Sequence, residues 1–139
     1  MTIETVADGI PFLVGRISFG VVLALMGLNH FTGLGGMSGY AAAKGVPAPR
    51  LAVAASGVAL AGGGLSIAFG IYPLVGAAVL ALFFLAVTPV MHDFWTVEDP
   101  ERRQSELTDF MKNVTLFGAA LVFLAVADTA WPYALGVGL

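Results

Sequence analysis

The stretch TPVMHDFWTVEDPERRQSELTDFMKN, residues 88–113, decides the fold, because it gathers most of the polar side chains of an otherwise apolar chain. Of the 139 residues, 58% are hydrophobic and only 11% are charged. A soluble domain usually carries about 25% charged residues. The sequence therefore predicts a multi-pass protein of a cell membrane, with the lipid bilayer as its surroundings. We expect a single transmembrane domain over residues 1–139.

Long apolar runs flank this stretch. The first runs from Ile10 to Leu28 with one charge, Arg16, and as a helix would extend about 28 Å, close to the hydrocarbon thickness of roughly 30 Å. No run alternates as barrel strands do. The sequence predicts an all-α, integral membrane four-helix up-down bundle with both termini on one side. The expected helices lie at about residues 11–31, 48–70, 73–92 and 107–127.

The second expected helix is rich in small residues, including Gly62, Gly63, Gly64 and Ser66. Small faces let helix backbones approach closely in lipid, where apolar burial gives little drive for association. The sequence leaves open whether this face packs inside the bundle or against a second copy. A homo-oligomer therefore stays among the expected partners.

The remaining segments carry weaker signals. Ser38 to Lys44 is expected to form a short interfacial helix, and residues 134–139 are expected to be loosely held. Arg16 is expected to pair with Asp128, because both lie toward the same membrane side. The first residues, MTIETVADGI, are acidic where a signal peptide would be basic, so no cleavable signal peptide is expected.

Helix parity places both histidines on one membrane side. The first and third helices end there, and the second and fourth begin there. We expect a polar ligand-binding cluster at this side, with no catalytic residue and no metal ligand assigned. Its members are Asn29, His30, His92, Asp93, Trp95, Lys112 and Asn113.

Three interpretations of this cluster stay open. It can be a purely structural network, in which Asp109 and Lys112 pair on one helix face. It can be a pocket for a quinone, a lipid or a polar headgroup. His30 and His92 with Asp93 or Glu106 would also suit zinc or iron, although no spacing enforces a shared metal.

Missing features restrict the chemistry. The chain has no cysteine, which excludes thiolate catalysis and cysteine-bound metal by this chain. It has no dinucleotide-binding fingerprint, phosphate-binding loop, HExxH or CxxC motif. We therefore do not expect an autonomous enzyme, and we expect no nucleic-acid partner.

Several short motifs, in order, carry a resemblance to a known family. They are Arg16, Gly27-Leu28-Asn29-His30-Phe31, His92-Asp93-Phe94-Trp95, and the segment from Gln104 to Asn113 with Glu106, Phe110, Lys112 and Asn113. In these features the chain resembles the DoxX family of small four-helix membrane proteins over about residues 10–127.

The resemblance implies a function that the composition does not. The DoxX family is similar to DoxD, the membrane subunit of thiosulfate:quinone oxidoreductases. The resemblance therefore implies that this chain is a redox-associated membrane subunit, with a redox partner protein and with quinone as the candidate cofactor. The alternative is a non-catalytic structural or lipid-interacting membrane scaffold.

The basic residues predict an orientation. Lys44, Arg50, Arg102 and Arg103 lie in the two connections on the histidine side, whereas the opposite side has only Arg16. Because lysine and arginine favour the cytoplasmic side of a membrane, both termini are expected to face outward.

Overall fold

The computed structural model describes residues 9–138, and in this part of the chain the secondary structure is helical. Four of the described helices are long and apolar enough to cross a membrane, which confirms the predicted all-α membrane bundle. The elements are α2 (Ile10–Thr32), α3 (Leu34–Ala43), α4 (Pro49–Phe69), α5 (Pro73–Met91), the 3-10 helix η1 (Phe94–Thr96) and α6 (Pro100–Ala125).

The last membrane helix begins earlier than residue 107, where the sequence placed it. Asp99 caps α6, because its side chain accepts a hydrogen bond of 2.9 Å from the backbone nitrogen of Arg102. Pro100 follows at the first helical turn, where a missing N–H costs nothing. The charged segment expected to be a loop is thus the solvent-facing start of α6.

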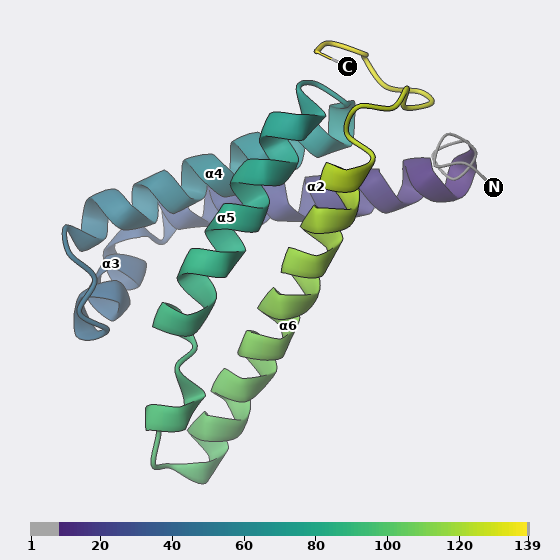
Figure 1. The fold of residues 1–139 in the computed structure, drawn as a ribbon. Coiled ribbons are helices and arrows are strands. Elements are labelled where there is room, and N and C mark those ends of the chain that lie inside the picture. Colours follow the sequence, from purple (N-terminus) through teal and green to yellow (C-terminus); the bar gives the residue numbers. More distant parts are fainter. Residues whose placement is uncertain (1–8, 139) are drawn as a thin grey trace.

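The four long helices form two pairs that diverge from one end. α2 packs along α4, α6 packs along α5, and α5 also contacts α4 (Figure 1). The pairs come together near the α4–α5 turn and separate toward α3 and η1 (Figure 1). The bundle is therefore closed at one end and open at the end that holds both histidines.

Glycines set the close approach of α2 and α4. A Cβ atom at Gly20 would overlap the carbonyl oxygen of Gly64, and one at Gly57 would lie 3.0 Å from the carbonyl oxygen of Gly27. Gly63 instead faces α5, where a Cβ would lie 2.7 Å from Cγ of Leu80. Gly57, Gly63 and Gly64 of α4 are therefore packed within the chain and need no second copy, whereas a Cβ at Gly62 would meet no atom within 4 Å.

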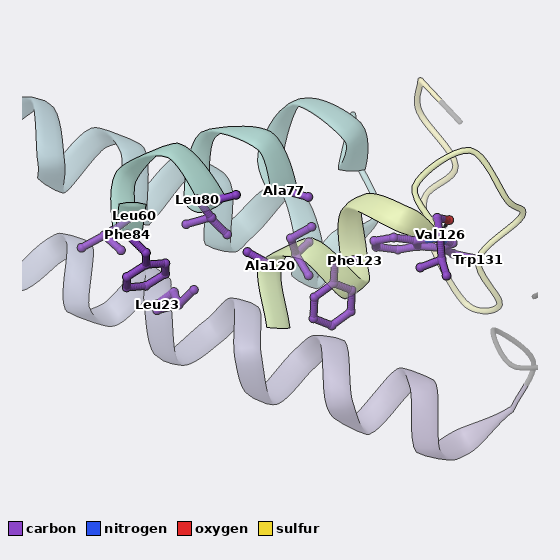
Figure 2. Close-up of a cluster of buried hydrophobic side chains, with 11 residues drawn as sticks. Leu23, Leu60, Ala77, Leu80, Phe84, Ala120, Phe123, Val126 and Trp131 are labelled. Atoms are coloured by element: carbon purple, nitrogen blue, oxygen red, sulfur yellow. Dashed lines mark hydrogen bonds between the residues drawn. The ribbon is translucent and has the colours of Figure 1, made fainter. Parts of the chain in front are cut away.

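A hydrophobic core lies where the two pairs meet. Leu23 of α2, Leu60 of α4 and Phe84 of α5 are almost completely buried there (Figure 2). Phe123 of α6 continues this core toward Trp131, with ring centroids 5.9 Å apart. These contacts hold the closed end of the bundle and leave the opposite end free to form cavities.

At the closed end of the bundle, the structure contradicts two expectations from the sequence, the first of which concerns Arg16. Arg16 is buried and donates hydrogen bonds to the carbonyl oxygens of Ala68 (2.8 Å), Pro132 (3.0 Å) and Tyr133 (2.7 Å). Among the described residues it forms no ion pair, and Asp128 is exposed instead. The expected Arg16–Asp128 pair is thus wrong, because the guanidinium bonds a backbone carbonyl in the last turn of α4 and two in the segment after α6.

The segment after α6 is also anchored rather than loose. The backbone nitrogen of Leu135 donates to the carbonyl of Phe69 at 2.9 Å, and that of Tyr72 donates to the carbonyl of Val137 at 2.7 Å. These bonds tie residues 134–138 to the α4–α5 turn. The remaining residue of the expected loose tail, Leu139, lies outside the described residues.

Candidate functional site

The end of α5 places His92 beside α6. Pro89 lacks a backbone N–H, and α5 ends two residues later at Met91. His92 then caps the helix, because its backbone nitrogen donates to the carbonyl of Thr88 at 3.0 Å. The chain leaves the helix axis here, which turns the His92 side chain toward the first turns of α6.

A carboxylate joins His92 to a tyrosine from α3. Nδ1 of His92 lies 2.9 Å from Oε2 of Glu106, and the Tyr40 hydroxyl donates to Oε1 of Glu106 at 2.7 Å. Because a carboxylate accepts hydrogen bonds, Nδ1 of His92 carries the proton. Both oxygens of Glu106 are thereby engaged. Partial burial, and then the hydrogen bond to Glu106, raise the pKa of Tyr40 above its ordinary value.

A second polar contact fastens the end of α3 to η1. Lys44 forms an ion pair with Asp93, and the Thr96 hydroxyl donates to Oδ2 of Asp93 at 3.0 Å. The hydrogen bond to Asp93 raises the pKa of Lys44 above its ordinary value. Tyr40 of α3 and Lys44, directly after α3, therefore attach this helix to the α5–α6 pair at two points.

Three of the expected site residues line one open cavity. His92, Lys112 and Asn113 border a space of about 560 Å³ between α2 and α6. Lys112 is paired with Asp109 at 3.2 Å on the exposed face of α6. Asp93 does not border this cavity, because it turns to Lys44.

Asn29 and Trp95 lie outside these contacts. Asn29 is exposed near the end of α2, and its carbonyl accepts from the backbone nitrogen of Gly33 at 2.8 Å. Trp95 is also exposed, and its ring packs edge-on against Phe94 and Phe110, with centroids 5.1 and 6.0 Å away. This aromatic group fixes η1 on α6.

His30, near the end of α2, belongs to a different, partly open cavity of about 460 Å³ that is also bordered by α3, α4 and α5. Its lining is mostly apolar, and its polar residues are His30, Tyr40 and Ser56. The apolar lining comprises Gly36, Met37, Ala41, Val46, Ala52, Val53, Phe83, Ala86, Val87, Val90 and Met91. We call this space the α3 cavity. The residues predicted as one cluster are therefore divided between two cavities.

The geometry does not support a shared metal site. Nδ1 of His30 contacts the carbonyl of Met26 at 2.9 Å, whereas His92 bonds Glu106. Over residues 9–138, no three histidine, aspartate or glutamate side chains are grouped closely enough to hold an ion.

The sequence-based site omitted Tyr40, Lys44 and Glu106. Glu106 had a detectable signal, since Glu106, Asp109 and Asn113 share one helix face by their spacing. Tyr40 and Lys44 had none, because their contacts depend on how α3 folds back toward α5 and η1. Tyr40 is the residue that joins the α3 cavity to the Glu106–His92 pair.

Comparison with known proteins agrees with the sequence motifs. The DoxX family profile matches residues 12–93, more than half of the chain, from the start of α2 to Asp93. No curated protein and no solved structure matches the chain. The match ends before α6, so the Gln104–Asn113 pattern lies outside it. With its four apolar helices, this multi-pass membrane protein belongs to the DoxX family.

Proposed function

We propose that this protein is the membrane subunit of a redox complex of the cell membrane and binds the ring of a quinone in the α3 cavity. The observation that carries the proposal is the cavity itself. Its volume of about 460 Å³ lies in the range of roughly 300–1,000 Å³ that small-molecule sites occupy. Apolar walls with a few polar atoms suit a ring that has polar groups and a long apolar tail.

The polar contacts beside the cavity support the same function. Tyr40 borders the cavity and donates to Glu106, which also bonds His92. Interconversion of a quinone and a hydroquinone transfers protons, and tyrosine, glutamate and histidine are groups that exchange protons. The chain has no cysteine thiol to carry the electrons, and we assign their supply or removal to a partner protein.

A structural or lipid-binding scaffold is the second candidate. It is favoured by the pairing of charged groups within the chain at this end of the bundle. Lys44 pairs with Asp93, His92 with Glu106, and Lys112 with Asp109. Such internal pairing satisfies polar groups near lipid and requires no ligand.

Binding to purified, delipidated protein separates the two candidates. We expect decylquinone to bind in detergent, measured by equilibrium dialysis. Ala52→Phe adds a ring inside the cavity wall and should weaken binding at least tenfold. Ala55→Phe is the control, because Ala55 is exposed on the same helix and does not line the cavity. Absence of binding, or equal weakening by both substitutions, would favour the scaffold.

A further inference from the structure

We infer that the α3 cavity selects a ligand with a free hydroxyl group over the matching carbonyl or ether compound. The inference rests on the proposed function only in taking the α3 cavity as the ligand site. It concerns the hydrogen-bonding character of the ligand, which the apolar walls and the volume do not determine.

The contact between His30 and Met26 fixes the tautomer of the imidazole. Nδ1 of His30 lies 2.9 Å from the backbone carbonyl oxygen of Met26. A carbonyl oxygen only accepts hydrogen bonds, so Nδ1 must be the protonated nitrogen. In the neutral ring the other nitrogen, Nε2, then carries a lone pair and accepts a hydrogen bond. His30 thus offers an acceptor to a ligand.

Tyr40 supplies the cavity wall with a second hydrogen-bond acceptor. Its hydroxyl has one hydrogen, which is donated to Glu106 at 2.7 Å. The Tyr40 oxygen can still accept a hydrogen bond, but it has no further hydrogen to give. The third polar side chain on the wall, Ser56, has a hydroxyl that can donate or accept.

Two of the three polar side chains are therefore acceptors only. A ligand hydroxyl can donate to such a wall and still accept from Ser56. A ligand carbonyl or ether has no hydrogen to donate and places its lone pairs against lone pairs. The ether therefore leaves these acceptors without a partner, whereas a hydroxyl supplies one.

Two kinds of membrane molecule carry a free hydroxyl group on an apolar body. One is a hydroquinone, whose phenolic hydroxyls stand on an apolar ring. The other is a lipid-derived alcohol on an acyl chain. Both present a hydroxyl on an apolar body, and probes of equal chain length distinguish them.

The test compares matched probes on delipidated protein at pH 8 without oxygen. Decylhydroquinone is measured against decylquinone and its own dimethyl ether, and decanol against decyl methyl ether. We expect the preferred hydroxyl probe to bind roughly tenfold more tightly than its ether, which is the upper range for one additional hydrogen bond. Preference within the first set identifies a hydroquinone, and preference within the second identifies a lipid alcohol. Either result supports the inference.

Variants of His30 assign the preference to this residue. His30→Phe should reduce the difference between hydroxyl and ether, because only the Tyr40 acceptor remains, and His30→Gln should restore part of it, because an amide oxygen accepts. Asn29→Ala is the control, since Asn29 is exposed beside it and does not line the cavity. An undiminished preference in His30→Phe would overturn the assignment to His30.

The two proposals fail in different ways. If neither set of probes shows a preference for the hydroxyl compound and Ala52→Phe still weakens the binding of decylquinone, the inference is wrong while the quinone site stands. If no probe binds, the proposed function fails and the inference fails with it.

Discussion

Arg16 of α2 donates a hydrogen bond of 2.8 Å to the carbonyl oxygen of Ala68, in the last turn of α4. The last carbonyls of a helix lack partners within it and lie at the negative end of its dipole. A buried guanidinium satisfies such a carbonyl and is itself stabilised by the dipole. The same side chain reaches the carbonyls of Pro132 and Tyr133, so one residue joins α2, α4 and the segment after α6.

Arg16→Gln should destabilise the closed end of the bundle by about 2–3 kcal/mol. Hydrogen bonds with a charged partner contribute roughly 1.5–3 kcal/mol, and an amide cannot reach three carbonyls on two segments. Thermal unfolding in detergent measures the loss. The stability of Arg16→Lys should lie between that of Arg16→Gln and that of the unmodified protein, because a compact ammonium keeps the charge without the planar guanidinium.

Ser18→Ala is the control for these changes, since Ser18 is exposed on the same helix. Equal stability of Arg16→Gln and the unmodified protein would show that the carbonyl contacts contribute nothing.

Gly64→Ala should destabilise the bundle by about 1–3 kcal/mol, the usual cost of overpacking. Its added methyl group would overlap the carbonyl oxygen of Gly20, so α2 and α4 would have to separate. Gly62→Ala is the matched control on the same helix, with no atom within 4 Å of the added carbon. In a soluble helix, alanine is favoured over glycine by about 1 kcal/mol, so the control should be neutral or stabilising. Equal thermal stability of the two variants would contradict the close helix contact.

The sequence predicted the fold well because lipid imposes simple rules on it. Helices must be long, apolar and internally hydrogen-bonded, and these properties can be counted along a chain. The start of α6 escaped prediction, because Glu101 and Arg102 look like loop residues. The first turn of α6 depends on a local cap, Asp99, which is followed by Pro100 at the first helical position. Length and polarity therefore define the membrane crossing, but not how far a helix extends into water.

The site was predicted less completely, because helix parity gives depth and not direction. Parity correctly indicates that His30 and His92 share one end of the bundle, yet they border different cavities. Asp93 lies next to His92 in sequence, but the chain turns there and Asp93 meets Lys44. Which side chains meet depends on the divergence of the helix pairs and on the path of α3, and neither leaves a pattern in the residues.

Alkaline pH should weaken the attachment of α3. The pKa values of Tyr40 and Lys44 are both raised from their ordinary values of 10.0 and 10.5. A raised folded-state pKa means that the folded protein holds the proton more tightly than the unfolded chain. This contribution is complete below the ordinary values, and it is lost as pH rises through the folded ones. Stability should therefore fall above about pH 10.

The double variant Tyr40→Phe/Lys44→Met isolates this effect. It removes both titrating groups, so its unfolding temperature should decline less steeply between pH 9 and pH 11.5 than that of the unmodified protein. The comparison cancels the titration of other tyrosines and lysines. Parallel pH profiles for the two proteins would show that these contacts do not stabilise α3.

The end of the bundle that holds the α3 cavity should face the cytoplasm. Lys44 after α3, Arg50 at the start of α4, and Arg102 in the first turn of α6 all lie at this end. Basic residues in short connections favour the cytoplasmic side.

The chain has no cysteine, so single introduced thiols report their own exposure. Ser105→Cys in intact cells should resist a membrane-impermeant maleimide and react after the cells are opened. Leu135→Cys, at an exposed position of the opposite end, should react from outside. Labelling of Ser105→Cys in intact cells, with Leu135→Cys protected, would reverse the orientation and place the opening of the α3 cavity on the outer side.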